Sequence, residues 1–268
     1  MSDKSKYNQL KFSISDYICT MEINREKYLN ALSKELIKQM IEFFDWADSN
    51  NDIKVIILYG SGDKSFVAGA DIREMSELNY DYIQSRSYAE LGQKLTLKIE
   101  NLSKPVIAAI NGYALGGGCE LAMACHIRYA SKSARFAQPE VGLGLIAGFG
   151  GTQRLPRLIG KGLAMELLLS GKIITSEEAL DIKLVNKVFD DKEQLLLGSK
   201  DIAKIMIKNS PAAIKNTIKA VNEGESKKLI KALDVEADIF AKTLSNYNDA
   251  REGLSSFLNK KKPKFSGN

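Results

Sequence analysis

The chain has 268 residues, of which 44% are hydrophobic and 26% are charged, as in an ordinary globular protein with a sizeable core. It contains no run of 18 uninterrupted apolar residues, which argues against a transmembrane helix. The net charge is +5, and the lysines are spread along the chain apart from a cluster at 260–264. We interpret them as a solvated surface with a basic tail; phosphate-bearing substrates and nucleic acid are the alternatives.

Few residues are present for nucleophilic or metal chemistry. The three cysteines, Cys19, Cys119 and Cys125, lack metal-ligand spacing, and we expect the last two to pack as small hydrophobic side chains. The single histidine, His126, leaves only one base for a Ser-His-Asp or Cys-His mechanism and has no ligand cluster around it, so we expect no metal site. Residues 1–6 lack the features of a secretory or transit signal, and we expect a cytoplasmic protein.

The first half of the chain alternates strand-like and helix-like patterns. Residues 10–23 predict a β-hairpin that turns at 15–16, and residues 30–47 have the apolar spacing of an amphipathic helix. Near-continuous aliphatic runs at 53–59 and 106–110 predict strands that are buried on both faces. This alternation favours an α/β fold.

Short strands are predicted at 127–130 and 134–136. After Gly160 the pattern of the chain changes. Beyond this residue the periodicity is mainly helical, at 164–169, 176–182, 195–208, 212–222 and 226–244. We therefore predict an α/β core over residues 1–200 and a helical region over residues 201–268.

A run of three glycines, Gly116 to Gly118, leads into an apolar, alanine-rich segment that contains Glu120. Glycine can take positive φ and lets the backbone approach a ligand closely. The N–H groups and the dipole at a helix start favour negative charge. Such a segment can hold an oxyanion with Glu120 beside it as an acid or base, although the same glycines could only pack a helix against a strand.

Three motifs together resemble, in order and spacing, the crotonase (enoyl-CoA hydratase/isomerase) superfamily. They are residues 66–72 (FVAGADI), 111–121 (NGYALGGGCEL) and 138–142 (QPEVG). The resemblance extends over nearly the whole chain and is closest to short-chain hydratases. It implies a spiral of repeated ββα units. It also implies C-terminal helices that cover the active site and mediate homotrimers, which can pair into hexamers.

The resemblance also implies catalytic roles. The N–H groups of Ala68 and Gly117 would stabilise a thioester enolate, Glu120 would activate water and Glu140 would exchange the α-proton. Two carboxylates around one water supply both the base and the proton source that hydration of a double bond needs. Taken alone, Glu120 could be a favourable first-turn residue and Glu140 a loop or capping residue, and the residues themselves do not say which one is the acid.

The substrate contacts implied by the resemblance concern coenzyme A as part of the substrate, so no separate cofactor is expected. Lys27 would meet a phosphate, although a solvated lysine is the alternative. Phe257 and Lys260 would reach the ligand of a neighbouring subunit. The full set of expected contacts is Lys27, Leu29, Ala68, Gly69, Ala70, Asp71, Ile72, Tyr113, Leu115, Gly116, Gly117, Gly148, Phe257 and Lys260. The Gly148 N–H would help to position the catalytic water.

One residue, His126, departs from the family pattern, and another, Phe149, agrees with it but bears on chain length. Phe149 stands where many relatives have alanine or phenylalanine; it either closes the acyl tunnel, which would favour short chains, or is a core aromatic. His126 replaces a usual aspartate, and we expect it to be a neutral core residue bonded to the backbone.

The sequence therefore predicts an enoyl-CoA hydratase that reversibly adds water to a short trans-2-enoyl-CoA, such as crotonyl-CoA. Another crotonase-type reaction, isomerisation or carnitinyl-CoA hydration, is the alternative, and retention of both glutamates weighs against a pure isomerase. RNA binding is a more distant alternative, because Glu35 and Glu42 interrupt the basic helix face that Lys34 and Lys38 begin.

Overall fold

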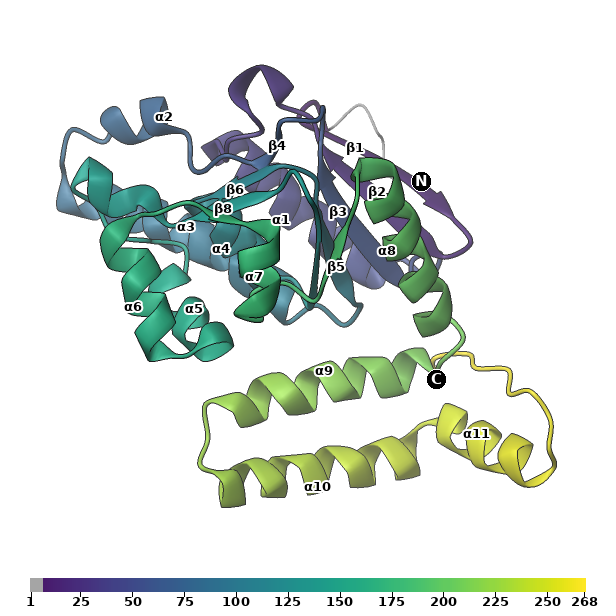
Figure 1. The fold of residues 1–268 in the computed structure, drawn as a ribbon. Coiled ribbons are helices and arrows are strands. Elements are labelled where there is room, and N and C mark those ends of the chain that lie inside the picture. Colours follow the sequence, from purple (N-terminus) through teal and green to yellow (C-terminus); the bar gives the residue numbers. More distant parts are fainter. Residues whose placement is uncertain (1–6) are drawn as a thin grey trace.

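A six-stranded sheet forms the centre of the fold, in a computed structural model that describes residues 7–268 (Figure 1). The expectation about a leader in residues 1–6 lies outside this range. Its strands in spatial order are β1 (Leu10–Ser15), β2 (Ile18–Ile23), β3 (Val55–Gly60), β5 (Val106–Ile110), β7 (Ile127–Ser131) and β10 (Lys187–Phe189). β1 and β2 form the predicted antiparallel hairpin, and all other neighbours are parallel.

A smaller sheet contains β4 (Ser65–Val67), β6 (Tyr113–Leu115), β8 (Arg135–Ala137) and β9 (Ile174–Thr175). β4, β6 and β8 are parallel, and β9 is antiparallel to β8. Three successive turns of the chain, which begin at β3, β5 and β7, each place one strand in the large sheet, the next strand in the small sheet, and then one or two helices. The predicted α/β spiral of ββα units is confirmed.

The helices of the core follow the strands in turn. They are α1 (Lys34–Ser49), α2 (Ile72–Ser76), α3 (Tyr82–Glu100), α4 (Gly117–Ala124), α5 (Gly151–Ile159), α6 (Lys161–Ser170), α7 (Ser176–Asp181) and α8 (Lys192–Met206), with short 3₁₀ turns η2 (Glu26–Tyr28) and η3 (Pro139–Leu143). Helix α1 begins later than residue 30 because the Ser33 hydroxyl caps it, accepting the Leu36 N–H at 3.0 Å.

The central strands β3 and β5 are buried on both faces, as their aliphatic runs predict. On β3, Ile56 belongs to the main core, whereas Val55 and Ile57 pack in a second cluster with Leu195 of α8. Helix α8 is therefore part of the core. The boundary predicted at residue 200 falls inside it, and the change to separate helices comes after Met206.

The C-terminal helices form a layer of their own beside the core (Figure 1). They are α9 (Pro211–Glu225), α10 (Leu229–Asn246) and α11 (Asn248–Leu258). Across residues 7–268, none of the helices combines the length and the apolar character needed to cross a bilayer.

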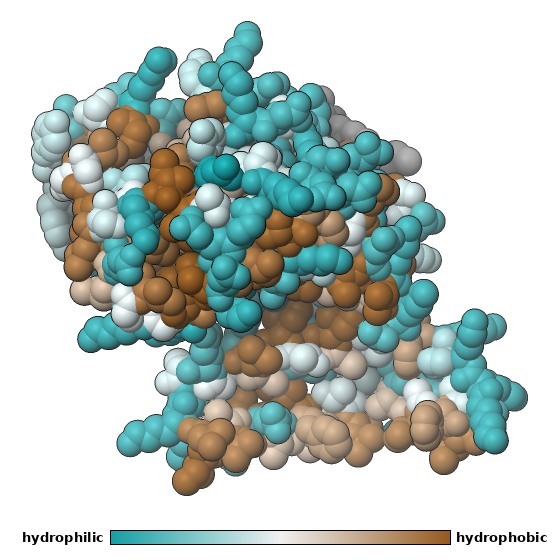
Figure 2. All heavy atoms as spheres, viewed as in Figure 1, coloured by the Kyte–Doolittle hydropathy of each residue, from teal (hydrophilic) through white to brown (hydrophobic). Residues whose placement is uncertain are grey.

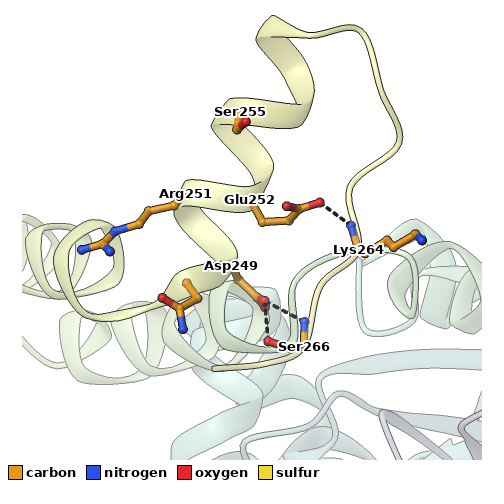
Figure 3. A pocket seen from close by; sticks show the side chains of 7 residues that line it. Asp249, Arg251, Glu252, Ser255, Lys264 and Ser266 are labelled. Carbon is orange, nitrogen blue, oxygen red and sulfur yellow. Dashed lines mark hydrogen bonds between the residues drawn. The ribbon is translucent and has the colours of Figure 1, made fainter.

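The last residues fold back along α11 and are fastened to it by two carboxylates (Figure 3). Asp249, which is buried, accepts the Ser210 hydroxyl at 2.7 Å and the Ser266 N–H at 2.8 Å. Glu252 accepts the Lys264 N–H at 2.8 Å. These bonds hold the tail around a pocket of about 430 Å³.

Candidate active site

Glycines allow the start of α4 to approach its neighbours closely. Gly116 has φ of 47°, and a Cβ there would lie 2.8 Å from a carboxylate oxygen of Glu140. A Cβ on Gly118 would lie 1.9 Å from the Val67 carbonyl oxygen. The sequence therefore needs glycine at both positions, first to admit the Glu140 carboxylate and then to pack α4 against β4.

Two backbone segments lie side by side at this helix start, and each offers an N–H group as a candidate oxyanion donor. One of these donors is not the residue that the sequence predicts. The Ala68 N–H donates to the Leu29 carbonyl at 3.1 Å, so the prediction of Ala68 as an oxyanion donor is wrong. A Cβ on Gly117 would lie 3.3 Å from the Ala70 nitrogen, which places the backbones of Gly117 and Ala70 side by side. Within residues 7–268, the Ala70 N–H has no hydrogen-bond acceptor. Ala70 and Gly117 are therefore the candidate donors.

Glu120 lies in the first turn of α4, and only 2% of its surface is exposed. Its Oε1 accepts the N–H groups of Phe149 at 2.8 Å and Gly151 at 2.6 Å. Burial raises the pKa of Glu120 to about 7, and the charge of Glu140 adds to the rise, while the two N–H groups and Arg154 oppose it. Glu120 is therefore a fixed carboxylate that can exchange a proton near neutral pH.

Glu140 lies at the start of η3, half-buried, and burial raises its pKa as well. The buried amide of Gln138 lies against it: turned with its nitrogen toward Glu140, it donates to the two carboxylate oxygens at 3.0 and 3.1 Å. The charge of Glu140 contributes to the raised pKa of Glu120, so the protonation of the two carboxyls is described jointly. Gln138 belongs to the third motif, but the sequence alone indicates no role for it.

Phe149 belongs both to the core and to the site. It is 4% exposed, and its ring centroid lies 5.7 Å from that of Tyr88. A Cβ on Gly92 would overlap its ring, and one on Gly117 would lie 3.2 Å from it. The ring thus forms a wall directly beside the candidate donor Gly117. The carbonyl of Gly148, next to it, accepts the Gln93 amide at 2.9 Å; the role predicted for the Gly148 N–H stays a prediction.

Some of the predicted CoA contacts surround the same region. Lys27 and Leu29 line a pocket of about 370 Å³ together with Lys64, which the sequence did not single out. Ile72, the first residue of α2, is 53% exposed, and Tyr113, the first residue of β6, is 41% exposed.

The other predicted contacts differ in their surroundings. The Asp71 carboxylate is engaged by the Arg25 guanidinium at 3.0 Å. Phe257 and Lys260 lie at the end of α11 and beyond it, in the C-terminal layer and far from α2 and α4 in Figure 1. The structure therefore does not bring these last two to the site of the same chain.

His126 has the environment expected from the sequence. Its Nδ1 accepts the Val106 N–H at 2.9 Å, and its Nε2 lies 3.2 Å from the Glu100 carbonyl oxygen. Burial lowers the pKa of His126 to about 4, so the ring is neutral at physiological pH. The histidine replaces the usual aspartate as a structural residue.

A profile of the enoyl-CoA hydratase/isomerase family matches residues 13–268. The chain belongs to this family. Among its relatives, the short-chain-enoyl-CoA hydratase of Clostridium acetobutylicum is 45% identical over 245 residues, which cover 91% of this chain and 92% of that protein. The crotonyl-CoA hydratase of Syntrophomonas wolfei is 43% identical and covers 97% of this chain and 98% of that protein.

Solved structures of the family agree with this relationship. The enoyl-CoA hydratase of Bacillus anthracis superposes with a TM-score of 0.91 at 34% identity, covering 97% of this chain and all of that chain (100%). The family fold therefore extends through the C-terminal helices.

Proposed function

We propose that this protein is an enoyl-CoA hydratase that reversibly adds water to short-chain trans-2-enoyl-CoA, with crotonyl-CoA as the representative substrate. The observation that carries the proposal is the buried carboxylate Glu120 beside Glu140, next to adjacent backbone segments at Ala70 and Gly117. Both family relatives named above are short-chain or crotonyl-CoA hydratases.

The proposed reaction uses the backbone first. The thioester carbonyl oxygen accepts the N–H groups of Ala70 and Gly117, which stabilise the negative charge that develops on it as the enolate forms. Fixed peptide dipoles at a helix start suit this task, because they need no rearrangement when the charge appears.

The carboxylates then handle the protons. Ionised Glu120 takes a proton from water while the water oxygen bonds to C3, and protonated Glu140 gives a proton to C2 on the same face. The double bond becomes a single bond, and hydrogen and hydroxyl have been added across it. Proton return from Glu120 to Glu140 restores the starting state. The raised pKa values of both groups suit a pair that shares one proton.

Phe149 supports the restriction to short acyl chains. Its ring is fixed between Tyr88, Gly92 and Gly117, so it cannot swing aside without disturbing α3 or α4. An acyl chain that starts at the candidate donors would therefore meet this ring after a few carbons.

For the nucleotide part of the substrate, we propose that Lys27 and Leu29 act from the pocket that they line, with Lys64 as a further cation. The remaining contacts would come from the 69–72 loop and from Tyr113, Leu115 and Gly116. The CoA thioester is the substrate, and the proposed reaction needs no other cofactor.

We also propose a homotrimer, or a hexamer built from two trimers. The C-terminal layer carries many exposed apolar side chains, which Figure 2 shows in brown along its lower edge; they include Leu229, Ile230, Leu233, Phe240, Phe257 and Leu258. Association would bury them, and would bring Phe257 and Lys260 to a neighbouring subunit's substrate.

The decisive experiment is a hydration assay with purified protein and trans-2-enoyl-CoA thioesters from C4 to C16, with products identified by mass spectrometry. The expected result is 3-hydroxyacyl-CoA, formed fastest from C4. Conversion of the 2-enoyl-CoA to its 3-enoyl isomer without hydration would replace the proposal by an isomerase. Salt-sensitive RNA binding without turnover would replace it by a binding role.

A further inference from the structure

All three guanidinium nitrogens of Arg154 donate hydrogen bonds to the protein around it. It extends from α5 to Glu100, the last residue of α3, and makes a two-pronged ion pair: Nε to Oε1 at 3.0 Å and Nη2 to Oε2 at 2.8 Å. The remaining nitrogen, Nη1, donates to the Thr96 hydroxyl and to the Phe149 carbonyl, both at 3.1 Å. Only 12% of the side chain is exposed. A planar guanidinium held in this way is a rigid support.

The turn that Arg154 supports is the one that binds Glu120. The Thr96 hydroxyl also lies 3.0 Å from the Phe149 carbonyl oxygen, so this carbonyl is held from two sides. The N–H of Phe149 and the N–H of Gly151 both donate to Glu120 Oε1. The backbone of Phe149 therefore connects the Arg154 guanidinium, bonded to its carbonyl, to the Glu120 carboxylate, bonded to its N–H.

The shape of the turn is fitted to the guanidinium. Gly150 has φ of +114°, and a Cβ there would lie 2.1 Å from Arg154 Nη1. The glycine is thus needed twice, for its backbone conformation and for the space that Arg154 occupies.

We propose that Arg154, held by Glu100, is the positioning residue of Glu120: it fixes the Phe149–Gly151 turn so that both N–H groups point at Oε1. This inference rests on the proposed hydratase function. Arg154 does not touch the reacting atoms. It acts on the rate by keeping Glu120 in one orientation and by placing a positive charge near it.

The support continues to the C-terminal layer. The Glu100 backbone carbonyl accepts the Asn222 amide of α9 at 2.6 Å and faces His126 Nε2 at 3.2 Å. The end of α3 is therefore anchored independently of its side chain, so Glu100→Gln can weaken the ion pair without releasing the helix.

The test separates geometry from charge. Arg154→Lys keeps the positive charge but loses the fork, and kcat for crotonyl-CoA should fall roughly ten- to a hundredfold, the scale of small misplacements in an active site. KM should change less than about twofold, because neither Arg154 nor Glu120 lines the pocket that contains Lys27 and Leu29. Arg154→Gln should lower kcat similarly. It should also move the acidic limb of the pH–rate profile to higher pH, because the positive charge of Arg154, which lowers the pKa of Glu120, is gone.

Glu100→Gln should give the same loss in kcat to a smaller extent, and the Glu100→Gln/Arg154→Lys double variant should be no worse than Arg154→Lys alone. Arg157→Lys is the matched control. This exposed arginine lies on the same helix and donates to the Gln153 carbonyl at 2.6 Å, so kcat and the pH profile should not change.

The proposal is overturned if folded Arg154→Lys and Glu100→Gln keep wild-type kcat, or if Arg154→Gln loses activity with an unshifted acidic limb. Additive losses in the double variant also contradict it. If the Arg154 variants do not fold, Glu100→Gln decides alone. Absence of hydration in the wild-type enzyme would instead remove the proposed function, which is a separate outcome.

Discussion

Glu120 lies in the first turn of α4 and His126 just beyond its C-terminal end, and burial moves their pKa values in opposite directions. The pKa of Glu120 rises from 4.5 to about 7, and the pKa of His126 falls from 6.5 to about 4. Both groups are thereby held neutral over part of the weakly acidic range. Their effects on stability are opposite in sign, because one group gains a proton on folding and the other loses it.

The first prediction concerns the pH dependence of unfolding. Glu120, with a raised pKa, stabilises the folded state most below pH 4.5, and this stabilisation is lost as the pH rises to 7. His126, with a lowered pKa, stabilises it most above pH 6.5, and this is lost as the pH falls to 4. Each group contributes a slope of up to about 1.4 kcal/mol per pH unit, so the two should largely cancel between pH 4.5 and 6.5.

Single variants should reveal the opposing slopes. His126→Gln should leave a stability that falls from pH 4.5 to 7, and Glu120→Gln a stability that rises from pH 4 to 6.5. The latter variant should also be more stable than wild type at pH 8, since a buried charge is gone. Denaturant unfolding across pH at fixed protein concentration measures this. Three superimposable curves would contradict both assignments.

The second prediction is that both glutamates are essential. Glu120→Gln and Glu140→Gln should each lower kcat by on the order of 10²-fold or more, the contribution of positioned acid–base groups. Affinity for a CoA thioester should change little, because the Lys27 pocket is intact. Steady-state kinetics with crotonyl-CoA and binding of a non-reacting thioester provide the two readings. Near-normal turnover in either folded variant would remove that residue from the mechanism.

The third prediction concerns the backbone donor at Gly117. This residue is the first of α4, a position where proline is tolerated because its N–H has no helical partner. Gly117→Pro removes the donor and should lower kcat about 10²- to 10³-fold, as for other oxyanion donors.

Gly117→Ala is the control for Gly117→Pro. It brings the same Cβ into contact with Phe149 at 3.2 Å but keeps the N–H, so it should cost far less activity. Circular dichroism and oligomer mass confirm that both variants fold. Equal kinetics for the alanine and proline variants would show that crowding, and not the donor, matters at this position.

The fourth prediction concerns chain length. Phe149→Ala should raise kcat/KM selectively for substrates of C10 or longer, since each methylene newly accommodated contributes up to about 0.8 kcal/mol. The variant also leaves a cavity beside Tyr88, and stability should fall by about 3–5 kcal/mol. Phe149→Leu should keep more stability and give an intermediate profile. Lower stability with an unchanged chain-length preference would leave Phe149 as a core residue only.

Much of the fold follows from local pattern, and the exceptions have physical causes. The aliphatic runs of β3 and β5 identify themselves because both faces are buried. Helix α3, by contrast, was not predicted: most of its residues are exposed, and Gly92 lies at its centre to make room for Phe149. Its position depends on a contact with a residue far along the chain, which periodicity does not contain.

In the candidate site, too, the residue types identify some features, whereas others depend on contacts between distant parts of the chain. The glutamates and the glycine run could be found because their residue types are distinctive. The prediction of Ala68 as a donor is wrong because residue types do not distinguish it from Ala70: both are alanines of one motif, and only the backbone shows that the Ala68 N–H is engaged by Leu29. Arg154 was missed for a related reason, because its role comes from Glu100 on another helix.

The small sheet places two parts of the proposed reaction on different strands: activation of the thioester carbonyl and transfer of a proton. Ala70, Gly117 and Glu140 each come shortly after the end of a parallel strand, β4, β6 and β8 in turn. Neighbouring strands lie about 4.8 Å apart, so the sheet itself sets the spacing of the three positions that we propose face the thioester. In the proposed mechanism, the segments after the first two strands polarise the thioester carbonyl through the backbone alone, whereas the segment after the third strand contributes a side chain. Replacement of Glu140 would therefore change the proton transfer, whereas the backbone N–H groups that activate the thioester would stay in place.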